Sequence, residues 1–267
     1  MRLRLLTLAG LCMVLLAGCS ITSRKPAGTA SPEAVPPPPT NPDATPDAIP
    51  RREPRSAHGN PPFYSVLGKR YAVLGSADGY LERGVASWYG PTFHGESTSN
   101  GEKYNMYGMT AAHKTLPLPT YARVTNLKNG RSIVVRINDR GPFVANRLID
   151  LSYTAAAKLD MLKEGTTLVE VKALTVQEPD ELTRSAETPP PALYVQAGAF
   201  SEQGNAQRML DRLHKAGMPS AFILAPPDGK PPLYRVRVGP IGSVPEFDQL
   251  AAKLKALGIP DARLATD

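Results

Sequence analysis

The sequence has few cysteines, few aromatic residues and no long apolar segment. Its 267 residues include two cysteines, Cys12 and Cys19, and one tryptophan. The apolar run from Leu5 to Leu16 is too short to span a bilayer. Because no cysteine follows residue 19, a disulfide, a cysteine metal site and a cysteine nucleophile are excluded from the rest of the chain.

The N-terminus has the order of a secretory signal, because Arg2 and Arg4 precede the apolar run. The run ends in the letters LAGC at Cys19, which resemble a bacterial lipobox. This resemblance implies that residues 1–18 are removed and that the Cys19 thiol is lipidated. Ser20 next to it favours sorting to the outer membrane, with the protein facing the periplasm. The alternative is an ordinary signal peptide with a chance cysteine.

The 28 prolines are too unevenly spread for a single compact domain. Residues 19–62 and 176–191 are rich in proline and poor in apolar side chains, which predicts a disordered tether and a linker. We therefore expect an N-terminal extension at 63–83, a first domain at 84–175 and a second domain at 192–267. The net charge of +7 predicts a polyanionic partner, which can be nucleic acid, anionic lipid or an acidic polysaccharide.

The first domain consists of short predicted strands separated by Gly, Asn and Pro, with Asn129 and Gly130 as a hairpin turn. About six strands in so short a segment predict a small closed barrel, because an open sheet would leave exposed edges. One helix is expected from Ser152 to Leu162, with Ser152 as its N-cap. Strands are expected at Gly84 to Tyr89, Met109 to Ala111, Tyr121 to Asn126, Ser132 to Asn138 and Thr167 to Ala173, and in the extension at Phe63 to Leu67 and Arg70 to Leu74.

The segment from Gly84 to Leu162 closely resembles the rare lipoprotein A family of double-psi β-barrel proteins. The resemblance is carried by GVASWYGPTFHG, by NGEKYNMYGMTAAHKTLP, by VRINDRGPF and by RLIDLSYTAAAKL. It implies a six-stranded double-psi barrel in a bacterial envelope lipoprotein, and a lytic transglycosylase acting on peptidoglycan. Such an enzyme cuts the β-1,4 bond between N-acetylmuramic acid and N-acetylglucosamine without water and leaves a 1,6-anhydromuramic end. Because related barrels in expansins loosen walls without hydrolysis, a non-catalytic wall-binding protein is the alternative.

Cleavage of that bond requires a carboxyl group that protonates the leaving oxygen while an oxocarbenium-like centre develops. Asp139, displayed at a strand end, fits this role and can then act as base for the substrate's own 6-hydroxyl. The resemblance adds Glu102, which can stabilise the cation, and His113, which can hydrogen-bond a carboxylate. Structural alternatives stay open: Asp139 as a turn residue paired with Arg140, Glu102 as a solvated turn acid, and His113 as a buried structural histidine.

Other polar and aromatic residues near these motifs receive weaker assignments. Trp88 and Tyr89 can stack on sugar rings, although a lone tryptophan is as often part of a core. Asp150 is expected to cap the following helix and not to act in catalysis. The histidines and acids show no metal-ligand spacing and there is no phosphate-binding glycine loop, so no metal and no cofactor is expected.

The C-terminal region is predicted to follow the order β, α, β, β, α, β. YVQAGAF, ending at Phe200, and YRVRVGP resemble the runs of SPOR domains, which implies a ribonucleoprotein-like fold that binds peptidoglycan. Alternation puts Gln196 and Phe200 on one face of the first strand, and Arg235 and Arg237 on one face of the third. The elements are expected at Leu193 to Phe200, Ser201 to Ala216, Ala221 to Leu224, Tyr234 to Val238 and Pro245 to Leu257, followed by a last strand.

A glycan stripped of its stem peptides is the expected partner of this region. Its bared carboxylates offer negative charge to Arg235 and Arg237, while Gln196 and Phe200 face the sugar. The alternatives are ordinary solvated arginines and RNA binding, and export and the missing RNP1-type run argue against nucleic acid. Together these resemblances imply an enzyme held in a bilayer by Cys19 and enriched at the division septum, with division proteins as further partners.

Overall fold

The computed structural model describes residues 37, 41–175, 192–226 and 232–266. The predicted signal peptide, the lipidation site Cys19 and the linker 176–191 lie outside the described residues. Within the described ranges, no helix is both long enough and apolar enough to cross a membrane.

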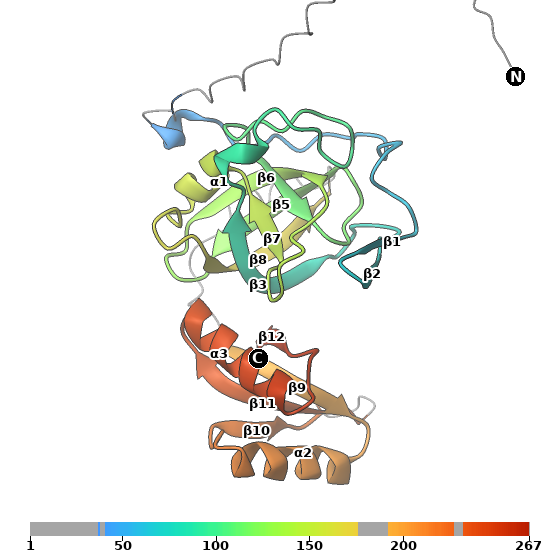
Figure 1. Cartoon of the computed structure of the whole chain (residues 1–267), viewed down its shortest axis with the longest axis vertical. Coiled ribbons are helices and arrows are strands. Elements are labelled where there is room, and N and C mark those ends of the chain that lie inside the picture. Colours follow the sequence, from blue (N-terminus) through green and yellow to red (C-terminus); the bar gives the residue numbers. More distant parts are fainter. Residues whose placement is uncertain (1–36, 38–40, 176–191, 227–231, 267) are drawn as a thin grey trace, which may run out of the picture. The chain divides into compact units, whose positions relative to one another are not determined.

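Six strands close into a barrel in the order β3-β7-β4-β6-β5-β8 (Figure 1). Two neighbouring pairs, β3 with β7 and β4 with β6, are parallel, and the other four pairs are antiparallel. The predicted closed barrel of six strands is confirmed, and its closure leaves no exposed edge. The strands are β3 (Leu81–Trp88), β4 (Thr110–His113), β5 (Thr120–Asn126), β6 (Ser132–Asp139), β7 (Ile149–Leu151) and β8 (Thr167–Leu174).

Two of these strands differ from the prediction. β3 begins at Leu81, inside the segment expected to be an N-terminal extension. β7 was not predicted, because three residues are too few to show a clear alternation. The interior of the barrel is filled by apolar side chains that are fully buried, among them Val124, Val135, Ile137, Ile149, Leu151, Val169 and Val171.

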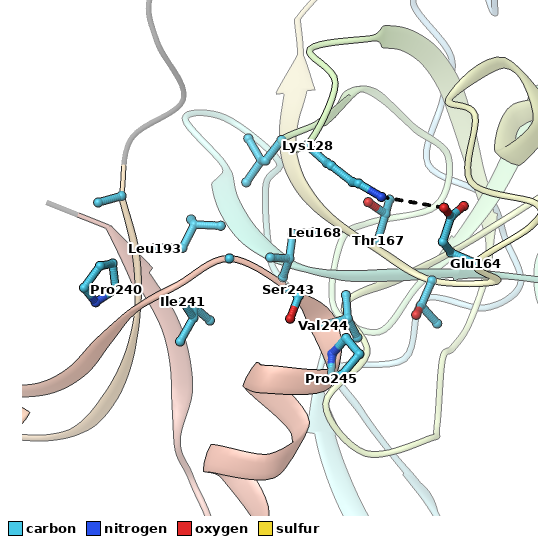
Figure 2. Close-up of a pocket in the computed structure, with 14 residues that line it drawn as sticks. Lys128, Glu164, Thr167, Leu168, Leu193, Pro240, Ile241, Ser243, Val244 and Pro245 are labelled. Atoms are coloured by element: carbon cyan, nitrogen blue, oxygen red, sulfur yellow. Dashed lines mark ion pairs between the residues drawn. The ribbon is translucent and has the colours of Figure 1, made fainter. Parts of the chain in front are cut away.

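The predicted local signals of the barrel are present. Ser152 caps the helix α1 (Tyr153–Lys158), because its hydroxyl accepts a hydrogen bond from Ala155 N at 3.2 Å. Gly130 turns the chain between β5 and β6 with a φ of +75°. Beside this turn, Lys128 Nζ lies 3.6 Å from Glu164 Oε1 (Figure 2). Both side chains are exposed, so this pair contributes about 0–1 kcal/mol.

Residues 41–62 are not the disordered tether that their composition predicts. After a 3₁₀ turn, η1 (Pro42–Ala44), the segment runs along the barrel. Asp47 Oδ2 accepts a hydrogen bond from Val134 N at 2.7 Å, and Ala48 N donates to Val134 O at 3.0 Å. Ser56 N donates to Leu118 O at 2.8 Å. The tether prediction is wrong here because hydrogen bonds and ion pairs, which composition does not reveal, order the segment. We call residues 47–60 the strap.

A two-stranded hairpin follows the strap, as predicted for this part of the extension. It consists of β1 (Phe63–Val66) and β2 (Lys69–Ala72). The rings of Tyr64 and Tyr71 lie 6.2 Å and 5.8 Å from that of Phe143, which follows the turn after β6. A second 3₁₀ turn, η2 (Pro91–Phe93), follows β3.

The C-terminal residues form a four-stranded antiparallel sheet in the order β10-β11-β9-β12, and two helices pack on one face of it (Figure 1). This confirms the predicted order β, α, β, β, α, β. Ser243 Oγ caps α3 by accepting from Glu246 N at 3.3 Å, and Pro245 lies in the first turn (Figure 2). The elements are β9 (Leu193–Phe200), α2 (Gln203–Lys215), β10 (Ala221–Leu224), β11 (Tyr234–Ile241), α3 (Val244–Ala256) and β12 (Arg263–Thr266).

Candidate functional site

Four residues lie in a row across four neighbouring strands of the barrel. Ala112 of β4 is in register with Asp139 of β6 on one side and with Asp150 of β7 on the other. Asp150 is in turn in register with Ser87 of β3. Residues in register project from the same face of a sheet. We call these four residues the carboxyl row.

The carboxyl row faces the outside of the barrel. Its chain neighbours Ala111, Ile149 and Leu151 are at most 1% exposed and belong to the interior core. Because alternate residues of a strand point to opposite faces, Ala112 and Asp150 point outwards. Asp139 joins them because the register of β4 and β6 shifts between Ala111 and Ala112, which leaves Asn138 as an extra residue in β6. Two strand spacings of about 4.8 Å separate the backbones of its two acids by about 10 Å, and the small side chain of Ala112 lies between them. The row thus places two carboxyl groups on one face of the barrel wall, on either side of Ala112, which is itself fully buried.

Asp139 is held by donors from the loop before β4. Its Oδ1 accepts hydrogen bonds from Ser99 N at 2.7 Å, from Ser99 Oγ at 2.6 Å and from Arg140 N at 2.7 Å. Its Oδ2 accepts a longer hydrogen bond, 3.2 Å, from the Tyr89 hydroxyl. Three donors therefore fix one oxygen, and the other remains the oxygen that can exchange a proton with a substrate.

The Tyr89 hydroxyl is a donor to Asp139 and not a base. Burial, followed by the charges of Asp139 and Asp150, raises the pKa of Tyr89 well above its usual value. The Tyr89 ring lies 4.8 Å from the ring of Tyr104 and 6.0 Å from that of Phe93. The ring of Trp88 packs against the barrel core and, at 5.8 Å, against Tyr153.

Asp150 does not cap the following helix, and that prediction is wrong. Ser152 is the cap, while the Asp150 carboxyl accepts a hydrogen bond from Ser87 Oγ. Burial raises the pKa of Asp150, and the Ser87 hydrogen bond and the charges of Lys114 and Arg147 oppose this effect only in part. Asp150 is therefore the acid of the row that holds a proton more readily than an ordinary aspartate.

Glu102 is held as a carboxylate. Its Oε2 accepts hydrogen bonds from Arg136 Nη1 and from Asn138 Nδ2, both at 2.8 Å. Its Oε1 accepts from Asn100 Nδ2, also at 2.8 Å. Partial burial raises the pKa of Glu102, but the hydrogen bonds from Asn138, Asn100 and Arg136 outweigh burial and lower it. Because Asn138 precedes Asp139 and Asn100 follows Ser99, the same two segments hold both acids.

His113 is a buried structural histidine and does not bond a carboxylate of the site. Its Nδ1 accepts from Thr115 N at 3.2 Å and Leu116 N at 3.1 Å. Its Nε2 therefore carries the proton and donates to Tyr80 OH at 2.8 Å. Burial, assisted by nearby cations, lowers the pKa of His113 to about 3. The contacts of His113 are those of a buried structural histidine, because both ring nitrogens have partners that are not carboxylates.

The neutral state of His113 makes stability pH-dependent. In the unfolded chain a histidine binds a proton below about pH 6.5, whereas folded His113 does so near pH 3. Below about pH 6.5 the unfolded state therefore binds more protons, and stability falls as pH falls. We expect the free energy of unfolding in urea to decrease by up to about 1.4 kcal/mol per pH unit between pH 6 and pH 5. If the free energy of unfolding of His113→Gln depends less on pH, His113 is confirmed as the source of this dependence. If the wild-type free energy of unfolding does not change between pH 6 and pH 5, the prediction is contradicted.

Arg140 is an anchor and not the ion-pair partner of Asp139. Its guanidinium donates to Gly59 O at 2.8 Å, to Leu116 O at 2.5 Å and to Asn60 Oδ1 at 3.1 Å. Burial lowers the pKa of Arg140 to about 10. The alternative of a turn aspartate paired with the adjacent arginine is therefore not what the structure has. Among the described residues there is no group of three or more His, Cys, Asp or Glu side chains that could hold a metal ion.

The C-terminal sheet has a second candidate site on the face away from its helices. Gln196 is in register with Arg237 of β11 and with Arg263 of β12, so these three side chains share that face. Arg235 is in register with Ala199 and lies on the same face. The Arg237 guanidinium lies 5.8 Å from the Tyr194 ring.

Phe200 does not share that face, although alternation along β9 predicted it. The register of β9 and β11 shifts at Ala197, where an extra residue in β9 forms a bulge. Beyond the bulge Phe200 is in register with Tyr234, and both rings pack against the core beneath the sheet. A one-residue bulge reverses the faces of all residues that follow it, and no pattern in the sequence predicts its position.

A protein-family model described as "Lytic transglycolase" matches residues 81–171, and one described as "SPOR domain" matches residues 189–264. The endolytic peptidoglycan transglycosylase RlpA of Pseudomonas aeruginosa (strain UCBPP-PA14) is 37% identical over 76% of this chain and 75% of that protein. The chain belongs to the RlpA family.

Two further relatives are also endolytic peptidoglycan transglycosylases RlpA. The protein of Vibrio cholerae is 48% identical over 63% of each chain, and that of Neisseria meningitidis serogroup A is 38% identical over 73% of this chain and 80% of its own. A crystal structure of the RlpA SPOR domain from Pseudomonas aeruginosa is 28% identical, covers 28% of this chain and 99% of that domain, and has a TM-score of 0.26.

Proposed function

We propose that this chain is an endolytic peptidoglycan lytic transglycosylase and that the carboxyl row is its catalytic centre. It cleaves the β-1,4 bond between N-acetylmuramic acid and N-acetylglucosamine and leaves 1,6-anhydromuramic ends. The observation that supports this proposal is the placement of Asp139 and Asp150 on one outer face, on either side of Ala112. When two carboxyl groups flank a glycosidic bond, one can act on the leaving oxygen and the other on the attacking group.

The two acids divide the proton transfers between them. Asp150, which holds a proton more readily, donates it to the departing O4 of N-acetylglucosamine as the C1–O4 bond breaks. The 6-hydroxyl of the muramic residue attacks C1 and forms the anhydro bond, and Asp139 Oδ2 takes up its proton. One proton is released and one is accepted, so water is not consumed. Exchange with solvent then restores both acids.

Glu102 and Tyr89 do not transfer protons in this proposal. Glu102 stays ionised under its three donors, and its negative charge stabilises the oxocarbenium-like centre. The Tyr89 hydroxyl orients Asp139 Oδ2. His113 supports this site through the fold, because its contacts are with Tyr80 and the backbone.

Product analysis tests the proposed function. Protein lacking the first 19 residues is incubated with peptidoglycan that an amidase has stripped of stem peptides, and the products are identified by mass spectrometry. Sugars with anhydro ends would confirm a lytic transglycosylase, whereas reducing ends would mean hydrolysis. Intact binding to the glycan without any soluble product would overturn the enzymatic proposal and leave a wall-binding protein.

The C-terminal sheet brings the barrel to its substrate. Arg235 and Arg263 give the sheet face away from the helices a positive charge beside Gln196, whereas Arg237 on the same face is only 6% exposed. A glycan strand without stem peptides carries free lactyl carboxylates, which are complementary to that charge. Lipid attached to Cys19 anchors the chain in the outer membrane, and the sheet concentrates it on stripped glycan at the division septum, next to the division proteins.

Replacing one arginine of the sheet face is expected to weaken wall binding without changing the chemistry. Arg235→Ala should lower the affinity for amidase-treated sacculi by about five- to tenfold, roughly 1–1.4 kcal/mol, in a pull-down titration. Arg208→Ala is the matched control, because Arg208 is exposed on α2, which packs on the opposite face. Equal binding by wild type and Arg235→Ala would remove this face from the proposal.

A further inference from the structure

A chain of contacts connects the strap to a charged residue of the candidate catalytic centre. Glu53 Oε1 lies 3.0 Å from Arg136 Nε, and Glu53 Oε2 lies 2.7 Å from Arg136 Nη2. The remaining nitrogen, Nη1, donates to Glu102 Oε2 at 2.8 Å. Two of the three guanidinium nitrogens thus bind the strap, and the third binds Glu102.

The geometry of this contact fixes the direction of the guanidinium. A bidentate pair between an arginine and a carboxylate holds the planar group in one orientation. Arg136 and Glu53 are mostly buried, with 16% and 18% of their side chains exposed, whereas Glu102 is 43% exposed. Solvent screening is therefore weaker at the strap than at Glu102. The Glu53 carboxylate is fixed in turn by the Tyr121 hydroxyl at 2.5 Å.

The strap also contacts the residues next to Asp139. Gly59 O and Asn60 Oδ1 accept hydrogen bonds from the Arg140 guanidinium at 2.8 Å and 3.1 Å. A Cβ atom on Gly59 would lie 2.7 Å from the carbonyl oxygen of Ser99, so the strap touches the loop that binds the Asp139 carboxyl. The strap residues that make these contacts precede residue 81, where the match to the lytic transglycolase family begins.

We propose that Glu53 of the strap is a positioning residue for catalysis, because it orients Arg136 so that Arg136 holds Glu102. This inference rests on the proposed function. The strap is therefore part of the catalytic unit, although the sequence places it in a proline-rich tether. A barrel that starts after the strap would lack the group that sets the orientation of Arg136.

The test compares two acid-to-amide changes on the strap. Glu53→Gln should lower kcat for anhydro-product release by about five- to twentyfold and leave KM within twofold of wild type. Asp47→Asn is the matched control, because Asp47 also bonds β6 and a basic side chain, Lys158 at 2.5 Å, but does not contact Arg136 or Glu102. The control should keep wild-type kcat. An unchanged kcat in Glu53→Gln, or an equal loss in both variants, would overturn the inference.

A second comparison separates positioning from a general loss of structure. If Glu53 acts through Glu102, adding Glu53→Gln to Glu102→Gln should cause no further loss of kcat, whereas independent effects would multiply. NMR titration of labelled glutamate should show a different pKa for Glu102 in Glu53→Gln than in wild type, because Arg136 is then no longer held by the Glu53 carboxylate. This readout does not need turnover. A wild type without anhydro product would overturn the proposed function, and an unchanged Glu102 titration would overturn the inference.

Discussion

Asp139→Asn is expected to lower kcat for the release of anhydro-ended sugars by about 10²- to 10⁴-fold, the usual contribution of a positioned acid or base. The amide oxygen can still accept the hydrogen bonds from Ser99 and Arg140, so the loop keeps its place. The amide can no longer take a proton from the 6-hydroxyl. Mass spectrometry of digests of amidase-treated sacculi measures this loss.

The loss in Asp139→Asn must come from the chemistry and not from unfolding. Asp160→Asn is a suitable control, because Asp160 is exposed and its φ of +56° suits asparagine as well as aspartate. The control should match the wild type in rate and in urea midpoint. A rate for Asp139→Asn within tenfold of the wild type would exclude this carboxyl as an acid or base.

Asp150→Asn is expected to cause a loss of similar size, about 10²- to 10⁴-fold in kcat, and to change the pH profile. A general acid works only while it is protonated, so wild-type kcat should fall as pH rises through the pKa of Asp150. Burial raises that pKa, which moves the fall to a higher pH than for an ordinary aspartate. The residual activity of the variant should lack this descending limb.

Ser87→Ala provides the matched test of this assignment. The Ser87 hydroxyl donates a hydrogen bond to Asp150 and thereby lowers its pKa. Its removal should shift the descending limb to higher pH without abolishing activity. An unshifted limb in Ser87→Ala, together with a nearly normal rate in Asp150→Asn, would show that another group is the acid.

Local patterns in the sequence were sufficient to predict most of the elements that carry the site, but not β7. The turn at Asn129 and Gly130, the cap at Ser152 and the strand that ends in Asp139 are each specified within a few residues. Asp150 was misjudged because its three-residue strand was missed. Ile149 and Leu151 on either side of Asp150 are the local signal of an outward-facing acid, but three residues are too few to identify a strand.

The roles of Glu102 and His113 depended on contacts that their neighbours in sequence do not reveal. Both were placed by resemblance, and the structure separates them. Glu102 is held by Arg136 and Asn138, which are more than thirty positions away, whereas His113 is enclosed by Tyr80 and its own turn. A motif reads the same whether its histidine or glutamate lies in the site or is buried elsewhere in the fold.

The sequence by itself determined the order of the elements in the C-terminal region and all strands of the barrel except β7, because apolar periodicity, caps and turns act over a few residues. Its motifs indicated the family. Only the tertiary structure decided that β4 lies between β6 and β7, which brings Asp139 and Asp150 to either side of Ala112. It also decided the bulge at Ala197 and the course of the strap. Periodicity specifies which face a side chain takes, whereas register, bulges and long-range ion pairs are set by packing between segments far apart in the chain.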